Sequence, residues 1–306
     1  MILLASRKDD GTTCYVIEWL NALGKKYVRL NTDDDLTKFL YYDSEKNALV
    51  FIQNQMEINL FEAKSIWIRR NGFSLENIVL NKASINKDVY FDKEGFHKSH
   101  INAEMKVLIE FFHQSIKNNC HKFIGSFKNG ELNKMNVLQM AERYGLKIPE
   151  SFIVTTKKKL LELFEKHDNL LTKALGSGVY RFVGDKSYYS YTEKLTLKNI
   201  QSLPDMFFPS LIQVEVKKKY ELRVFFLKGE FYAMAIFSQR NKNTSLDFRK
   251  PNFKIPNRKV PYSLPESIKL ILKDLMAELE LNTGSIDLIV DTNGDYVFLE
   301  VNPVGQ

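Results

Sequence analysis

Two short apolar runs close the sequence, and they constrain the fold more than any other feature. Residues 286–291 (IDLIVD) and 296–301 (YVFLEV) each read as a strand, and residues 292–295 (TNGD) lie between them. An Asn-Gly pair between apolar runs is a strong β-hairpin signal. The sequence therefore predicts that the chain ends in two paired strands.

Three oxygen-bearing side chains interrupt these apolar runs. Asp287 lies in the first run, while Glu300 and Asn302 are two residues apart and therefore share one face of the second strand. Hard cations such as Mg²⁺ bind carboxylate and amide oxygens and usually keep water or phosphate ligands as well. We predict a magnesium site at these residues. The alternative is a sheet edge with ordinary solvated acids.

A lysine followed by a glycine-containing loop is the second feature with chemical meaning. The predicted strand at residues 170–173 (LLTK) ends in Lys173, and residues 174–178 (ALGSG) follow it. This arrangement can place an ammonium group on a phosphate and lay backbone N–H groups over the remaining oxygens. The spacing matches neither a Walker A motif nor a dinucleotide-binding fingerprint, and a plain turn is the alternative.

The third feature is residues 213–223 (QVEVKKKYELR). An extended backbone here can meet the edge of an adenine, an acidic residue can hold ribose hydroxyls, and Arg223 can reach a transferred phosphate. The three lysines at residues 217–219 favour an acidic partner. A solvated, lysine-rich turn is the alternative interpretation.

The rest of the sequence reads as an α/β protein. Residues 2–30 give a strand, a loop, a helix and a second strand, the opening of a Rossmann-like unit. Long helices are predicted at residues 95–116 and 134–144, the latter closed by Gly145. Short strands dominate after residue 150, and a further helix is predicted at residues 266–279.

Composition excludes several classes of protein. The chain has 306 residues, of which 44% are hydrophobic, so it can bury a sizeable core and is not a disordered tail. Its 2 Cys residues cannot build a disulfide framework, which favours a reducing, cytoplasmic location. The first residues contain too few apolar positions for a signal peptide or a membrane span. A net charge of +7 favours an anionic partner without selecting one.

Together these features resemble the ATP-grasp superfamily of carboxylate-amine ligases across roughly residues 120–306, and residues 1–90 resemble its pre-ATP-grasp domain. More narrowly, the chain resembles the ATP-grasp maturases of ribosomal peptides, the graspetide or microviridin-type ligases, and most of all their grasp-with-spasm type. The narrower resemblance rests on stretches that lie across the whole chain. They are residues 67–70 (WIRR), 133–134 (NK), 145–149 (GLKIP), 238–241 (SQRN), 247–249 (DFR), 281–287 (LNTGSID) and 298–306 (FLEVNPVGQ).

The resemblance implies an α/β (α+β) chain with an ATP-grasp fold and an N-terminal Rossmann-like domain. Four parts are expected. They are a pre-ATP-grasp-like α/β domain at residues 1–90, a helical linker at 91–150, a central ATP-grasp subdomain with the lysine-glycine loop at 151–210, and a C-terminal ATP-grasp subdomain with the magnesium-binding strands at 211–306.

The activity implied is that of an ADP-forming ligase with ATP and Mg²⁺ as cofactors. It would activate Asp or Glu side chains of a precursor peptide as acyl phosphates and join them to Ser or Thr hydroxyls, or to Lys amines, as ester or amide crosslinks. The resemblance assigns roles to residues as follows. Cofactor-binding residues are Lys134, Lys173, Gln213, Glu215, Val216 and Glu221; catalytic residues are Arg223, Arg240, Arg249 and Asp247; metal ligands are Asp287, Glu300 and Asn302.

The expected partner is a precursor peptide with a leader and an acidic core, and a homodimer would suit the family. We place leader recognition at about residues 155–220, and we interpret Trp67, Arg69 and Arg70 as structural residues that act through core packing and an ion pair. No nucleic acid or membrane partner is expected. Members of the family that the chain resembles normally continue past Asn-Pro-Xaa-Gly-Gln into a final helix, whereas this sequence stops at Gln306. Either that tail was removed or it lies outside this sequence.

Two alternatives stay open. An ATP-grasp ligase that adds amino acids to a protein or joins small molecules would share the nucleotide site, although residues 238–249 resemble the peptide cyclases more closely. A non-catalytic nucleic-acid binder would need clustered Lys and Arg with exposed aromatic residues. Here the lysines are spread along the chain, and the aromatic residues mostly occupy apolar strand positions.

Overall fold

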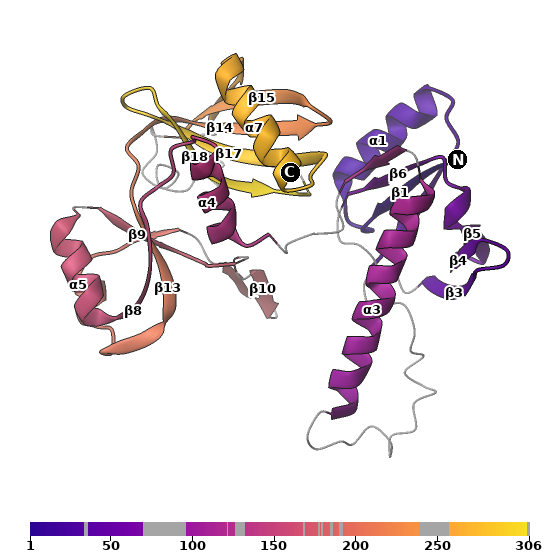
Figure 1. Cartoon of the computed structure of the whole chain (residues 1–306), viewed down its shortest axis with the longest axis horizontal. Helices are drawn as coiled ribbons and strands as arrows, with labels where there is room; N and C mark the ends of the chain where they lie inside the picture. The colour runs from indigo at the N-terminus through magenta and orange to yellow at the C-terminus, as the bar shows by residue number, and fades with distance from the viewer. Residues whose placement is uncertain are drawn as a thin grey trace. The chain divides into compact units, whose positions relative to one another are not determined.

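The computed structural model describes residues 1–33, 36–69, 96–120, 122–125, 132–167, 169–176, 178, 180–183, 186–189, 192–238 and 257–304. The chain divides into two compact units, Met1–Asn129 and Gly130–Gln306. Figure 1 shows both units and labels many of their elements. No helix in the described ranges is long and apolar enough to cross a membrane.

The first unit contains a parallel sheet and an antiparallel one. Its elements are β1 (Ile2–Ser6), α1 (Gly11–Ala22), β2 (Tyr27–Asn31), β3 (Thr37–Asp43), β4 (Ala48–Gln53), β5 (Met56–Asn59), η1 (Leu60–Glu62), β6 (Ser65–Ile68), α3 (Phe96–Asn119) and β7 (Lys122–Ile124). The parallel sheet has the order β2-β1-β6-β7, and β3, β4 and β5 form the other sheet. The parallel β1-α1-β2 start confirms the predicted Rossmann-like opening.

A single core joins the two sheets of the first unit. Leu3 of β1 and Phe51 of β4 are buried in it, together with Phe112 and Ile116 from the C-terminal half of α3. The α3 residues are four apart, so they lie on one face of the helix. The helix predicted at residues 95–116 is therefore present, and it packs its apolar stripe on these strands (Figure 1).

The second unit holds the C-terminal strands and most of the predicted site. Its elements are α4 (Lys134–Arg143), β8 (Ser151–Thr156), α5 (Lys157–Lys166), β9 (Leu170–Lys173), β10 (Tyr180–Val183), β11 (Lys186–Tyr189), β12 (Glu193–Lys194), α6 (Leu197–Gln201), β13 (Met206–Val214), β14 (Lys218–Leu227), β15 (Glu230–Phe237), β16 (Arg258–Tyr262), α7 (Glu266–Glu278), β17 (Thr283–Asp291) and β18 (Tyr296–Asn302). Antiparallel pairs build a sheet of order β12-β9-β13-β8 and one of order β16-β15-β14-β17-β18, and β10 pairs with β11.

The predicted closing hairpin is confirmed as β17 and β18. Its turn forms because Asp291 Oδ1 accepts hydrogen bonds from the backbone N–H groups of Asn293 and Asp295, both at 2.9 Å. Gly294 has a φ of +91°, which a glycine adopts without a steric cost. In the larger sheet, β17 lies between β14 and β18, so the hairpin gains the further strand that its stability requires.

One face of this five-stranded sheet is apolar and covered by two helices. Leu272, Leu275 and Met276 of α7 and Val137 and Leu138 of α4 are buried against it (Figure 1). Helix α4 begins at a firm N-cap, because Asn133 Oδ1 accepts from the N–H groups of Met135 and Asn136 at 3.0 and 3.1 Å. This cap positions Lys134, the first helical residue.

The smaller sheet has its own core. Val154, Leu170 and Ile212 of its strands pack against Leu160 and Leu163 of α5. Two backbone hydrogen bonds tie the segments that flank this sheet to the β17–β18 hairpin: Thr292 N donates to Lys217 O at 3.1 Å and Phe298 N donates to Lys147 O at 2.8 Å. Of the two helices in the predicted linker, α3 packs in the core of the first unit and α4 in the core of the second. The predicted division into four parts stays a prediction.

Candidate active site

Strand register brings three of the predicted residues into one row. Arg223 on β14 lies opposite Asp287 on β17, and Asp287 lies opposite Glu300 on β18. A β-bulge at this point, between Asp287 and Leu288, places one extra residue on the β18 side. Bulges redirect side chains and are common beside active sites. Ser285 and Asn302 form the next pair along the same face.

Arg223 and Asp287 form a bidentate ion pair. The Nε atom of Arg223 donates to Asp287 Oδ1 at 3.0 Å, and its Nη2 donates to Oδ2 at 2.9 Å. The Asp287 side chain is 16% exposed and that of Arg223 is 25% exposed. Two parallel charge-assisted hydrogen bonds in a mostly buried place hold both groups in a defined geometry.

Lys134 and Glu300 form a second ion pair beside the first. Lys134 Nζ lies 3.0 Å from Glu300 Oε2, and the two side chains are 22% and 35% exposed. Lys134 is the first residue of α4, where the positive end of the helix dipole disfavours a lysine and favours a carboxylate. A lysine at this position destabilises the helix slightly, but it allows the side chain to contact Glu300.

The donor set at the end of the hairpin fits Mg²⁺. Asp287 and Glu300 supply carboxylate oxygens, and Asn302 supplies an amide oxygen that accepts one hydrogen bond, from Val304 N at 3.2 Å, and has a second lone pair. In the described ranges no three His, Cys, Asp or Glu side chains gather into a closed metal cage. An open set of two carboxylates and an amide suits a magnesium ion that shares its shell with phosphate and water.

Glu221, the predicted ribose ligand, lies on the same strand face as Arg223, two residues away. It is 6% exposed and forms an ion pair with Lys218. Ser238 Oγ lies 3.5 Å from Glu221 Oε1. The chain itself thus neutralises this buried carboxylate, and its ribose role stays a prediction.

The remaining predicted cofactor residues lie on the smaller sheet and its exit. Lys173 ends β9 opposite Leu211, and Gln213 lies two residues beyond Leu211, so both side chains share one face. Gln213 Nε2 donates to Ser151 Oγ at 2.9 Å. Glu215 pairs with Lys194 at 3.0 Å, and Val216, half-buried, follows it in the connection to β14.

Three predicted catalytic residues, Arg240, Asp247 and Arg249, lie outside the described residues, as does Arg70. Arg69 is described and is 5% exposed, with its Nε atom 3.5 Å from Asp10 Oδ2. This ion pair agrees with the structural role predicted for Arg69. Trp67 lies on β6, in the parallel sheet.

The basic strip expected at residues 217–219 needs a correction. Lys217 and Lys219 are exposed, but the Lys218 side chain is only 10% exposed and is paired with Glu221. The reason is a bulge on β14 between Lys218 and Tyr220, which lets Lys218 share the face of Glu221 three residues later. Two lysines, not three, are presented to a partner.

Sequence reasoning missed three polar residues of this region. The sequence predicts Lys218 as part of an exposed lysine strip, whereas it is mostly buried. Ser238 is fully buried and enters the sequence prediction only within residues 238–241. Ser285 is 3% exposed and faces Asn302 across the strands, and its Oγ atom has no hydrogen-bond partner among the residues that the structure describes. Ser285 lies two residues before Asp287 and therefore on the same strand face, which is the sequence signal that could have identified it.

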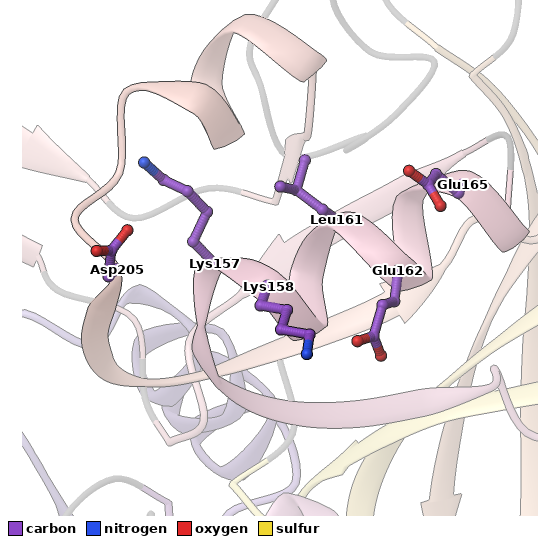
Figure 2. A pocket seen from close by; sticks show the side chains of 6 residues that line it. All are labelled: Lys157, Lys158, Leu161, Glu162, Glu165 and Asp205. Carbon is purple, nitrogen blue, oxygen red and sulfur yellow. The ribbon is translucent and has the colours of Figure 1, made fainter.

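A surface depression on α5 does not coincide with this constellation. Figure 2 shows its side chains along the helix, with Asp205 contributed by the turn before β13. It is lined by Lys157, Lys158, Leu161, Glu162, Glu165 and Asp205. Both signs of charge are present, and no predicted site residue lines it.

Comparison with known proteins establishes the fold. No family model and no curated protein matches the sequence. A RiPP-associated ATP-grasp ligase of Chryseobacterium gregarium, solved in complex with ADP and a leader and core peptide, superposes with a TM-score of 0.80 at 22% identity, over 100% of this chain and 89% of that chain. The macrocyclase MdnC of Microcystis aeruginosa, bound with precursor peptide MdnA, gives 0.76 at 23% identity, over 100% and 92%.

A third structure, the ATP-grasp ligase PsnB complexed with a phosphomimetic variant of a minimal precursor, Mg and ADP, gives a TM-score of 0.69 at 14% identity, over 100% of this chain and 90% of that chain. At these identities the likeness concerns the fold. The chain has the fold of ATP-grasp ligases, which confirms the predicted fold class.

Proposed function

We propose that this chain is an ADP-forming ATP-grasp ligase that crosslinks a ribosomal precursor peptide. It activates Asp or Glu side chains of the peptide as acyl phosphates and joins them to Ser or Thr hydroxyls, or to Lys amines, as esters or amides. The observation that carries the proposal is the row Arg223, Asp287 and Glu300, completed by Lys134. It places two carboxylates and two cations at one point of the fold.

The site supports phosphoryl transfer from ATP to a carboxylate. A peptide carboxylate oxygen forms a bond to the γ-phosphorus, and the bond from that phosphorus to the β–γ bridging oxygen breaks, which gives an acyl phosphate and ADP. Arg223 and Lys134 lie where they can stabilise the charge that spreads over the transferring group. Mg²⁺, when bound by Asp287, Glu300 and Asn302, would screen the phosphate charges during this step.

The second step forms the crosslink. A hydroxyl or amine of the same peptide attacks the acyl carbon, the bond from this carbon to the phosphate oxygen breaks, and inorganic phosphate leaves. The proton of the nucleophile passes to phosphate or solvent. Each crosslink therefore removes the elements of one water from the peptide and releases ADP and phosphate.

Nucleotide binding is proposed for residues of both sheets. Lys173 would contact phosphate, and Gln213, Glu215 and Val216 would line the adenine. Glu221 would hold the ribose. The support is their placement: Lys173 and Gln213 share a face of the smaller sheet, and Glu221 shares a face with Arg223 on the larger one. Arg240, Arg249 and Asp247 stay proposed catalytic residues from the sequence resemblance.

The proposed partner is a precursor peptide with a leader and an acidic core. The solved structures that share this fold include ligases complexed with leader, core or precursor peptides. Lys217 and Lys219 supply an exposed positive charge beside the site. We also propose a homodimer, a cytoplasmic location and no nucleic-acid partner.

The test uses the protein with ATP, Mg²⁺ and a candidate precursor peptide, which is sought as a short reading frame beside the gene with repeated Thr and Asp or Glu. Mass spectrometry is expected to show a peptide lighter by whole water masses, with one ADP per crosslink. A gain of amino-acid mass would instead show the alternative ligase that adds amino acids. RNA binding that persists without ATP, with no nucleotide turnover, would contradict the proposal.

A further inference from the structure

The two carboxylates that fit Mg²⁺ already have cationic partners within the chain. Asp287 is bound by Arg223 through two hydrogen bonds, and Glu300 lies 3.0 Å from Lys134. These four groups sum to a formal charge of zero. A divalent cation that enters alone must therefore compete with a guanidinium and an ammonium for the same oxygens, and it adds two positive charges to these four groups.

A polyphosphate changes this balance. Arg223 and Lys134 can transfer their hydrogen bonds from the carboxylates to phosphate oxygens, for which Arg and Lys are both well suited. Asp287 and Glu300 then become available to the metal. Neither exchange is favourable alone, since each would break an ion pair in a mostly buried place.

The position of Lys134 points the same way. At the first turn of α4 a lysine is opposed by the helix dipole, and nothing in the packing of α4 on its core requires a charge there. Its Nζ atom is held beside Glu300, the residue of the row that lies on the edge strand β18. Lys134 is thus placed to leave a carboxylate and meet an incoming anion.

We infer that Arg223 and Lys134 act as exchangeable counter-ions that make metal and nucleotide binding interdependent. They weaken the binding of a divalent cation by itself to Asp287 and Glu300, and they release these carboxylates when a nucleotide arrives. This inference rests on the proposed function only in taking a nucleotide as the anion. It makes a prediction of opposite signs: loss of the lysine or arginine must strengthen binding of the metal alone and weaken binding of the metal with nucleotide.

The experiment measures binding and not turnover. Mn²⁺ serves as the probe, and its free concentration is followed by electron paramagnetic resonance with the full chain, first alone and then with ADP. Lys134→Met keeps the length of the side chain and removes its charge. We expect Mn²⁺ alone to bind about fivefold more tightly to this variant than to the wild type. Mn²⁺ with ADP should bind about tenfold more weakly.

A matched control and a second pair keep the test decisive. Lys269→Met removes the lysine of an ion pair on α7, 3.1 Å from Glu266 and outside the row, and should leave both affinities unchanged. Arg223→Gln tests the same exchange at Asp287 if Lys134→Met fails to fold. In the double variant Lys134→Met with Glu300→Gln, the gain for Mn²⁺ alone should disappear, because the released carboxylate is gone.

The inference is overturned if Mn²⁺ alone binds each variant no better than the wild type. It is overturned equally if Mn²⁺ with ADP binds the variants as tightly as the wild type, because a merely structural ion pair would give the gain for Mn²⁺ alone without the loss with ADP. Failure of the proposed function looks different. If the variants bind Mn²⁺ alone more tightly and Mn²⁺ with ADP more weakly, but no precursor peptide loses water, then the exchange of counter-ions holds and the proposed ligation is wrong.

Discussion

Lys134, the first residue of α4, and Glu300, near the end of β18, lie 3.0 Å apart although 166 positions separate them in the sequence. The contact joins the start of a core helix to the edge strand of the larger sheet. It depends on two local structures, the N-cap at Asn133 and the bulge that precedes Glu300. The N-cap can be tested by protein stability, without an assay of the proposed ligase activity.

The N-cap is tested by Asn133→Ala. The variant loses a side-chain oxygen that accepts from Met135 N and Asn136 N, and N-cap losses cost about 1 kcal/mol. We expect the free energy of unfolding in urea to fall by that amount. Asn133→Asp keeps the acceptor and should stay within a few tenths of a kcal/mol. Equal losses in both variants would contradict the capping role.

The Lys218–Glu221 pair is tested by Lys218→Met. Both side chains are about one-tenth exposed, and removal of one partner of a buried ion pair costs roughly 3 kcal/mol. The matched variant is Lys219→Met, an exposed neighbour one residue away, which should change stability by less than about 0.5 kcal/mol. Urea unfolding measures both. Equal effects would mean that Lys218 is a surface lysine after all.

His113, a residue of α3, should make the free energy of unfolding fall at acidic pH. Burial lowers the pKa of His113 to about 4 from 6.5, so protonation favours the unfolded chain. The contribution is fully present above pH 6.5 and is lost as pH falls toward 4, which amounts to about 2 kcal/mol at pH 5. His113→Gln should remove this part of the pH dependence between pH 7.5 and 5. An unchanged slope in the variant would rule out His113 as its source.

Lys173 is tested through nucleotide dependence. Lys173→Ala should raise the ATP concentration needed for half-maximal turnover at least tenfold, because a phosphate contact is lost, and should leave peptide binding within about twofold. Lys269→Ala, which removes a lysine of α7 that pairs with Glu266 outside the proposed nucleotide site, serves as the control for loss of charge. An unchanged ATP dependence would remove Lys173 from the proposed phosphate contact.

Elements with strong local signals were predictable. The Asn-Gly turn, the strand that ends at Lys173 and the helix capped by Asn133 all appear where their residues predicted them. Helix α5 was absent from the prediction, although Leu160, Leu163 and Phe164 recur at helical spacing. Its ten residues lie between two short apolar runs that were both predicted as strands, at residues 152–155 and 170–173.

Contacts across strands were harder to foresee. Alternation along a strand correctly predicted that Glu300 and Asn302 share one face. The bulges beside Asp287 and Lys218 shift the alternation by one residue, and no pattern in the sequence predicts where they occur. The pairing of each carboxylate with a cation from another element depends on register, which emerges from the fold of the whole unit. The sequence therefore predicted which residues share one strand face, whereas their ion-pair partners could be identified only from the structure.

The most direct test of the account is the crosslinking assay with Glu300→Gln. This change keeps the shape of the side chain and removes one carboxylate from the row. Asp295→Asn, in the turn of the same hairpin and paired with Lys147, is the matched control. We predict that the Glu300 variant folds as the wild type does by circular dichroism but forms less than about a hundredth of the dehydrated peptide, while the control forms it normally. Full dehydration by Glu300→Gln would contradict the central claim.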